Sequence, residues 1–218
     1  MNSVTLNKVN NIYTLTLLRE GKFTDVLVRE INEAINQVEN DQDHVSLIIT
    51  GEGKNFSQGY DIEFLESCGN NVQAFIEDSL VTFSRLLSLG VPSVAAINGH
   101  AFGAGAMLSL ACDFRCMRED KGYFCLPEVD LGMDFHPFMS ALIKSKMSDR
   151  VIREAVLSGK RYSGAEALDR QIVDSSSSLD DLYIQAGNLM TPYVGKNRAT
   201  YSKLKTNFNS GILCHLKQ

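Results

Sequence analysis

One glutamate, Glu128, stands in a setting that favours proton transfer. It follows a proline and has apolar neighbours on both sides, at Phe124, Leu126, Val129 and Leu131. A carboxyl group in a partly dry pocket has a raised pKa, which suits it to take up and return a proton near neutral pH. The local sequence fits equally a carboxylate at a strand end that faces water. The pattern therefore indicates a candidate base and leaves its surroundings open.

A glycine turn in the most apolar stretch of the chain is the second chemical feature. A strand-like run at 93–97 breaks at 98–99, and a compact helical run follows at 104–111. Gly103 and Gly105 at the mouth of this helix allow close approach, and the first N–H groups of a helix have no partner within it. Such donors suit an oxygen that gains negative charge. The stretch predicts an oxyanion or phosphate site, although glycines of this kind often serve packing alone.

The same design occurs earlier in the chain. V-S-L-I-I-T-G followed by F-S-Q-G, at 45–51 and 56–59, resembles V-A-A-I-N-G followed by F-G-A-G, at 94–99 and 102–105. Two such strand-turn units, side by side in one sheet, would bring two outward-pointing N–H groups to one place. One oxygen could then receive two backbone hydrogen bonds, which is the usual build of an oxyanion hole.

Motifs of several other enzyme classes are absent from the sequence. A dinucleotide fingerprint would need a glycine at Leu108, and the chain has neither a phosphate-loop G-K-S/T triplet nor a G-x-S-x-G nucleophile turn. Ser57 and Ser109 lack an evident base partner, which disfavours a nucleophilic serine. No metal-ligand spacing links the histidines to cysteines or carboxylates, so we expect no catalytic metal. The histidines are His44, His100, His136 and His215.

The amino-acid composition limits the classes of protein to which this chain can belong. The chain has 218 residues, of which 44% are hydrophobic and 22% charged, as in an ordinary globular domain. A net charge of -5 with scattered lysines and arginines gives no sign of a nucleic-acid surface. The five cysteines form no C-x-x-C pair, which favours reduced thiols. The uncharged stretch at 91–112 contains Pro92, Asn98 and glycines, so a buried strand-turn-helix explains it better than a membrane span.

Periodicity predicts an α/β fold in which strands and helices follow one another. We expect a hairpin at 4–18, a helix capped by Thr24, a strand at 45–50, a helix at 71–89, strands at 113–117 and 123–126, helices at 136–147 and 149–157, a third helix capped by Ser163, a brief strand at Ile172-Val173, and helices at 179–190 and 195–208. The Thr191-Pro192 break suggests a core at 1–190 and a helical appendage at 191–218 that belongs to the same fold.

Three motifs together resemble the crotonase superfamily of enoyl-CoA hydratases and isomerases. They are F-S-Q-G-Y-D-I, A-I-N-G-H-A-F-G-A-G-A-M-L-S-L-A-C-D-F-R and L-P-E-V-D-L-G, in the family's order and spacing. The resemblance runs from about Val4 to Val173. It implies a spiral of strand-strand-helix repeats, C-terminal helices that mediate assembly into trimers or hexamers, and acyl-CoA thioesters as substrates.

The resemblance also implies roles for individual residues. The oxyanion donors would be the N–H groups of Tyr60 and Ala104, with Glu128 as the base. Hydratases of the family have a second glutamate where this chain has Met107, whereas a single glutamate at the Glu128 position resembles the Δ3,Δ2-enoyl-CoA isomerases. Substrate-binding positions would include Ser57, Gly59, Asp61, Ile62, Gly103, Met107, Leu131 and Phe135.

We therefore expect an enoyl-CoA isomerase that needs no dissociable cofactor, since coenzyme A is part of the substrate. The alternatives are another crotonase enzyme, a hydratase or thioester hydrolase, and a non-catalytic acyl-CoA-binding scaffold. The N-terminus shows no secretion signal and the last residues form no peroxisomal address, so we expect a cytoplasmic protein that binds neither nucleic acid nor membrane.

Overall fold

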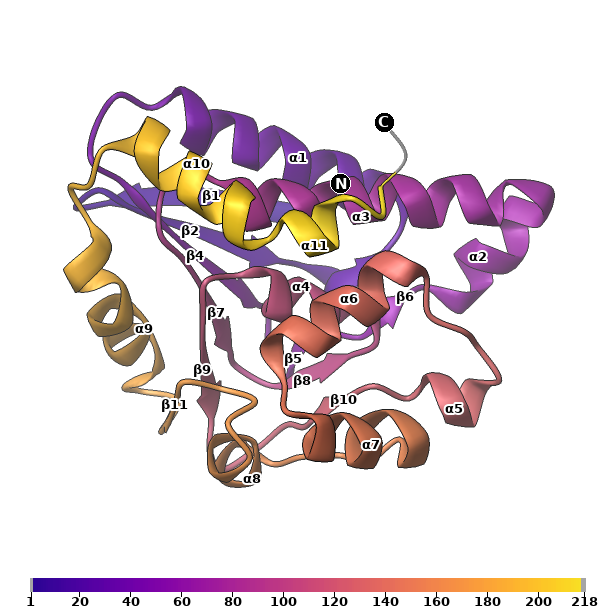
Figure 1. Cartoon of the computed structure of the whole chain (residues 1–218). Helices are drawn as coiled ribbons and strands as arrows, with labels where there is room; N and C mark the ends of the chain where they lie inside the picture. The colour runs from indigo at the N-terminus through magenta and orange to yellow at the C-terminus, as the bar shows by residue number, and fades with distance from the viewer. Residues whose placement is uncertain (1, 217–218) are drawn as a thin grey trace.

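A repeated strand-strand-helix unit organises the chain in the computed structural model, which describes residues 2–216 (Figure 1). The first strands of the units lie parallel in a six-stranded sheet of order β1-β2-β4-β7-β9-β11. These strands are β1 (Val4–Val9), β2 (Ile12–Leu17), β4 (Ser46–Gly51), β7 (Ser93–Ile97), β9 (Phe114–Arg118) and β11 (Ser175–Ser177). Only β1 runs antiparallel to its neighbour, as the first arm of the predicted hairpin.

The second strands of the units form two smaller parallel sheets. One has the order β10-β8-β5, with β5 at Asn55–Ser57, β8 at His100–Phe102 and β10 at Phe124–Cys125. The other pairs β3 (Lys22–Phe23) with β6 (Gly59–Tyr60). Because β4 pairs with β7 and β5 pairs with β8, the two glycine-turn units lie side by side, which confirms the arrangement predicted from the internal repeat.

Helices follow the strand pairs. They are α1 (Asp25–Asn40), α2 (Ile62–Cys68), α3 (Val72–Ser88), α4 (Ala104–Ala111), α5 (Glu128–Leu131), α6 (Pro137–Lys146), α7 (Asp149–Ser158), α8 (Gly164–Asp169), α9 (Leu182–Met190), α10 (Arg198–Phe208) and α11 (Ser210–Leu213), with short 3-10 turns at Arg19–Gly21, Gly69–Asn71 and Thr191–Tyr193. The predicted caps are present: the Thr24 side chain accepts from Leu27 N, and Ser163 forms a capping box with Glu166. No helix in the described part of the chain is both long and apolar enough to cross a membrane.

The central sheet is buried on both faces, which explains its unbroken apolar strands. Leu47 and Ile49 of β4 face the main core, where they pack with α1, α3 and α4. Ile48, from the same strand, joins a second cluster with Leu182 and Ala186 of α9. Helix α9 therefore covers one face of the sheet while α1 and α3 cover the other (Figure 1).

Two sequence-based expectations about local structure are corrected. The last strand is Ser175–Ser177, which pairs with β9, while Ile172 and Val173 lie in the main core as an irregular segment. Their apolar character reflects burial rather than pairing. Glu128 does not end a strand: it is the first residue of the one-turn helix α5, behind Pro127.

The segment from 191 onward packs along the body of the protein. Arg198 donates to the carbonyl oxygens of Val38 and Glu39 near the end of α1. Further along α10, Lys205 forms a 2.8 Å ion pair with Asp113. Ile212 of α11 is buried in the main core, so this segment shares its packing with the units that precede it.

Candidate active site

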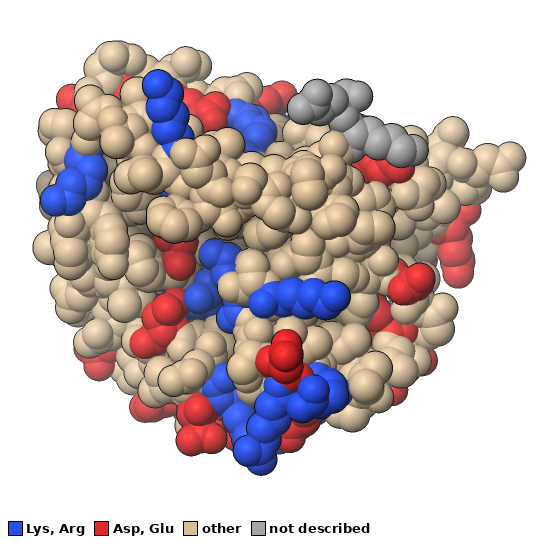
Figure 2. Space-filling model, in the orientation of Figure 1, with Lys and Arg blue, Asp and Glu red and all other residues tan. Residues whose placement is uncertain are grey.

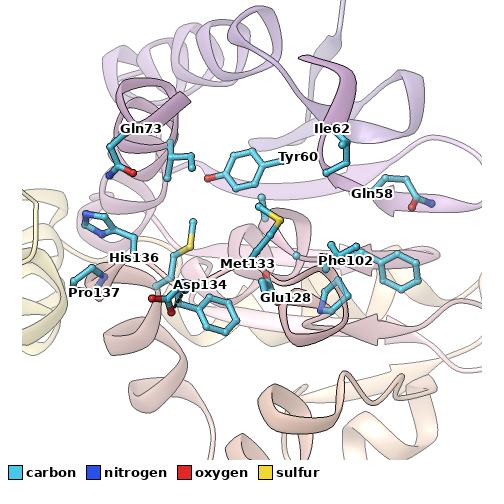
Figure 3. Close-up of a pocket in the computed structure, with 17 residues that line it drawn as sticks. Gln58, Tyr60, Ile62, Gln73, Phe102, Glu128, Met133, Asp134, His136 and Pro137 are labelled. Atoms are coloured by element: carbon cyan, nitrogen blue, oxygen red, sulfur yellow. Dashed lines mark hydrogen bonds between the residues drawn. The ribbon is translucent and has the colours of Figure 1, made fainter. Parts of the chain in front are cut away.

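A cavity of about 500 Å³ lies between the start of α2, the first turns of α3 and the segment 127–139 (Figure 3). Gly103 and Ala104, at the mouth of α4, form part of its wall together with Tyr60 and Glu128. The cavity thus joins both glycine-turn units to the candidate base. Most of its remaining lining is apolar, including the predicted residues Ile62, Leu131 and Phe135.

Glu128 is the half-buried carboxylate of this cavity. Burial raises the pKa of its side chain from 4.5 to about 7. Its Oε2 atom is buried and has no hydrogen-bond partner, and Oε1 lies 3.5 Å from the position that a Cβ on Gly103 would occupy. The carboxylate is therefore partly desolvated, has one oxygen without a partner, and lies close to the mouth of α4. Of the two environments that the sequence left open, the structure selects the partly dry pocket.

The two glycine turns approach each other closely beside Glu128. Gly59 has φ +81°, and a Cβ at this position would lie 2.6 Å from the Phe102 carbonyl oxygen and 3.2 Å from Ala104 N. Gly103 has φ +48°, which is also in the region that favours glycine. Because Gly59 and Gly103 have no Cβ, the peptide before Tyr60 can lie beside the first peptide of α4. The N–H group of Ala104, at the first position of α4, has no acceptor within the helix.

Side-chain contacts hold the Tyr60 turn in place. The Tyr60 hydroxyl lies 2.6 Å from Ser79 Oγ on α3, and Ser79 Oγ in turn donates to the Ile76 carbonyl oxygen. The Tyr60 ring packs edge-on against Phe23 and Phe75. The turn that carries the candidate donor is thereby fixed to the helix that forms the opposite wall of the cavity.

Several predicted binding residues support the site without lining it. Ser57 is fully buried, donates to the Gly21 carbonyl oxygen and accepts from Gly59 N, so it fixes the turn before Tyr60. Asp61 caps α2 by accepting from Phe64 N. Neither side chain is among those that line the cavity, and Gly59 is likewise packed behind its wall.

Met107 does not line the cavity, contrary to the expectation that it forms part of the acyl pocket. It is fully buried in the main core, since α4 is surrounded by protein on all sides. Met133, which the sequence analysis did not single out, lies in the wall near Glu128 instead (Figure 3). Met133 belongs to the irregular segment 132–136, which has no periodic signal and from which only Phe135 was predicted, through the family resemblance.

The two ends of the cavity have different neighbours. Phe102 and Gln58 lie at one end, and Gln73, His136 and Pro137 at the other, with Glu128 between them (Figure 3). At the first end, the Arg161 guanidinium lies 5.6 Å from the centre of the Phe102 ring. Burial lowers the pKa of the nearby His100, and the positive charges of Arg161 and Lys54 lower it further. Two cationic side chains, Arg161 and Lys54, therefore lie near the Phe102 end, although neither lines the cavity.

No cluster of histidine, cysteine and acidic side chains suited to a metal ion occurs within residues 2–216. Burial raises the pKa of the Cys112 thiol, and Cys125 donates to the Gly159 carbonyl oxygen, so these thiols are packing groups. On the face shown in Figure 2, lysines and arginines are interspersed with acidic residues and form no continuous basic stripe.

Comparison with known sequences identifies the family. Residues 8–218 match the family model described as enoyl-CoA hydratase/isomerase. The chain is 34% identical over 183 residues to enoyl-CoA delta isomerase 2, peroxisomal, of Arabidopsis thaliana, with 79% of this chain and 76% of the relative covered. It is 29% identical over 220 residues to a probable mitochondrial enoyl-CoA hydratase of Dictyostelium discoideum, with 99% of this chain and 74% of that protein covered.

Solved structures agree on the fold. An apo enoyl-CoA isomerase from Mycobacterium tuberculosis superposes with a TM-score of 0.90 at 22% identity, covering 99% of this chain and 94% of that one. An enoyl-CoA hydratase/isomerase family protein from Pseudomonas syringae gives a TM-score of 0.91 at 24% identity, over 98% and 93% of the two chains. With its repeated strand-strand-helix units, paired glycine turns and matched family model, the chain belongs to the enoyl-CoA hydratase/isomerase family, the crotonase superfamily.

Proposed function

We propose that this protein is a Δ3,Δ2-enoyl-CoA isomerase, which moves the double bond of a 3-enoyl-CoA into conjugation with the thioester. The observation that carries the proposal is one half-buried carboxylate, Glu128, whose Oε2 atom is buried without a hydrogen-bond partner, beside two glycine turns in one cavity. Moving a double bond by one position needs one group that accepts a proton at one carbon and returns it at another. One carboxylate with a pKa near 7 suffices for both steps.

In the proposed mechanism, Glu128 removes a proton from C2 of the substrate and its carboxylate becomes a carboxylic acid. The electron pair moves into the thioester carbonyl, whose oxygen becomes that of a dienolate. The N–H groups of Tyr60 and Ala104 would donate to this oxygen, and each such donor is typically worth about 3 kcal/mol of barrier. Glu128 then returns the proton to C4, so the electron pair comes to lie between C2 and C3 and the base is regenerated.

The remainder of the cavity fits this reaction better than hydration. Addition of water needs groups that hold and activate a water molecule. The other acidic side chain in the lining, Asp134, is exposed and accepts from the backbone N–H of Phe135. The names of the two Arabidopsis relatives at 34% identity, which are delta isomerases, also support isomerisation.

Charge favours one orientation of the substrate. Coenzyme A carries several phosphate charges, so its nucleotide end would lie at the Phe102 end of the cavity, near Arg161 and Lys54. The acyl chain would then extend past Glu128 toward Gln73 and His136.

The test is to incubate the purified protein with 3-enoyl-CoA substrates of short, medium and long chain and to follow formation of the conjugated 2-enoyl thioester. We expect turnover by the wild type and its loss in Glu128→Gln. Glu52→Gln, which changes an exposed carboxylate on the turn after β4, is the matched control and should turn over normally. Absence of conversion at every chain length would refute the isomerase proposal.

The same preparation separates the alternatives. Formation of a 3-hydroxyacyl-CoA from a 2-enoyl-CoA would identify a hydratase, and release of free coenzyme A a thioester hydrolase. Tight acyl-CoA binding without turnover would identify a scaffold. Assembly into a trimer or hexamer and a cytoplasmic location remain predictions, which sedimentation analysis and cell fractionation would test; the names of some relatives place those proteins in peroxisomes or mitochondria.

A further inference from the structure

The backbone N–H group of Tyr60 is turned away from the strand that pairs with it. Strand β6 runs parallel to β3, and the next residue, Asp61, donates from its backbone N to the Phe23 carbonyl oxygen at 3.2 Å. Successive N–H groups of a strand point to opposite sides, so the Tyr60 N–H group points away from β3. The first turn of α4 adjoins this part of the chain, since a Cβ on Gly59 would lie 3.2 Å from Ala104 N.

The peptide that carries this N–H group follows a glycine, which does little to hold it. Gly59 has φ +81°, and glycine restricts the chain less than any other residue. Ser57 Oγ accepts from Gly59 N and fixes the near side of the turn. A hydrogen bond weakens steeply with misalignment, so an oxyanion donor has to keep its direction. Beyond the single contact with β3, the direction of the Tyr60 N–H group therefore depends on what holds Tyr60 itself.

The side chain of Tyr60 is held at its far end by α3. Ser79 is fully buried, and its Oγ atom donates its one proton to the Ile76 carbonyl oxygen at 2.7 Å. The Tyr60 hydroxyl, 2.6 Å from Ser79 Oγ, is therefore the donor of that contact. Figure 3 shows the Tyr60 ring above Glu128, with its hydroxyl directed away from Gln58. One residue thus carries the candidate oxyanion donor on its backbone and an anchor to α3 at the tip of its side chain.

Aromatic contacts remove most of the remaining freedom of the ring. Its edge-on neighbours, Phe23 of β3 and Phe75 of α3, each lie 5.9 Å away between ring centres. Two torsions join a tyrosine ring to its backbone, so a ring that is held by its neighbours and at its tip also fixes the Cα–Cβ direction. Burial raises the pKa of the Tyr60 hydroxyl, which therefore stays protonated near neutral pH and keeps its donor.

We propose that the Tyr60 hydroxyl and Ser79 form a positioning pair for the reaction: their hydrogen bond holds the Tyr60 N–H group in the direction in which it meets the developing oxyanion. The inference rests on the proposed function for the role of that N–H group. Neither hydroxyl takes part in proton transfer, which belongs to Glu128. Loss of the pair should lower kcat by misaligning one donor, while the ring that lines the cavity stays in place and KM changes little.

The first variant, Tyr60→Phe, removes the hydroxyl and keeps the ring with its aromatic contacts. With a 3-enoyl-CoA substrate we expect kcat to fall about tenfold, which is less than the loss of a whole oxyanion donor, and KM to stay within about twofold of the wild type. The apparent pKa of the pH profile should stay near 7, since it reports Glu128. Ser79→Ala should have the same effect on kcat. The double variant should be no slower than the slower single variant, because both changes remove one interaction.

The matched control is Tyr162→Phe. Tyr162 is fully buried and donates its hydroxyl to Glu154 Oε2 at 3.1 Å, but it does not line the cavity. Urea denaturation should show a loss of stability in both tyrosine variants, whereas only Tyr60→Phe should lose kcat. A wild-type kcat in Tyr60→Phe, or an equal loss of kcat in Tyr162→Phe, would overturn the inference.

An infrared difference spectrum of bound 2-enoyl-CoA gives a second readout, which needs no turnover. A thioester carbonyl that accepts hydrogen bonds absorbs at a lower frequency. We expect this lowered frequency in the wild type and in Tyr162→Phe, and a return toward the value of the free thioester in Tyr60→Phe. If no 3-enoyl-CoA is converted, the isomerase proposal fails separately and the carbonyl frequency decides the matter. A carbonyl that is unshifted in the wild type, or shifted equally in Tyr60→Phe, would overturn the inference.

Discussion

Replacing Glu128 by glutamine should change the pH dependence of stability in a calculable way. Burial raises the pKa of Glu128 from 4.5 to about 7, so between these pH values the folded protein holds a proton that the unfolded chain has released. The free energy of unfolding therefore falls as pH rises through this range. Each unit of pKa shift corresponds to 1.36 kcal/mol, so the free energy of unfolding falls by up to about 3 kcal/mol by pH 8.

Glutamine cannot ionise, so Glu128→Gln should escape this loss. We expect its free energy of unfolding, relative to the wild type, to rise by up to about 3 kcal/mol between pH 4.5 and pH 8. Urea denaturation of both proteins at several pH values measures the difference directly, since other titrating groups are common to both. The glutamine amide of the variant adds a cost of burial that is the same at every pH. Comparing how the two free energies of unfolding change with pH therefore cancels this cost.

A difference between the two proteins that stays flat from pH 4.5 to pH 8 would refute the reasoning. It would mean that the Glu128 carboxyl has an ordinary pKa in the folded protein and is hydrated. The base of the proposed reaction would then lack the desolvation that distinguishes it from a surface glutamate. Glu52→Gln serves as control, because it removes a carboxylate that is exposed and does not line the cavity.

Three further predictions concern activity and packing. Because the base must be ionised, kcat/KM for a 3-enoyl-CoA should rise with pH to a plateau with an apparent pKa near 7, and a profile flat from pH 5 to pH 9 would contradict this role. Gly103→Ala places a side chain at φ +48°, so we expect the free energy of unfolding to fall by about 1–3 kcal/mol. Because the Ala104 N–H would be displaced, kcat should also be about 100-fold lower, and full activity would exclude this turn from the oxyanion site. Lys205→Met removes the cation 2.8 Å from Asp113, which keeps its hydrogen bonds from Ser93. We expect it to cost about 1 kcal/mol and to expose the junction before α10 to protease, whereas unchanged stability and cleavage would show that the ion pair does not hold the C-terminal segment.

The sequence by itself determined the repeating units and the approximate position of the chemistry. Apolar strands that end in a glycine break, each followed by a Phe-x-x-Gly or Phe-Gly run, are local patterns, and the strands 46–51 and 93–97 formed where these patterns predicted them. The short strands 55–57 and 100–102, which follow the two breaks, were not located by these patterns. Helix caps at Thr24 and Ser163 are likewise local, because a cap is a contact over three residues. The resemblance between the two units also predicted that they lie side by side.

The tertiary structure decided which side chains meet around the substrate. Whether Glu128 faced water or a dry pocket depended on α3 and the irregular segment 132–136, which no local pattern places against it. Met107 was expected in the pocket because it follows the glycine turn, yet the protein around α4 buries it, and Met133 lines the cavity instead. Burial of a charge, the polarity at the end of a cavity and the direction of a free N–H group all arise from segments far apart in the chain, so they are fixed only when those segments pack.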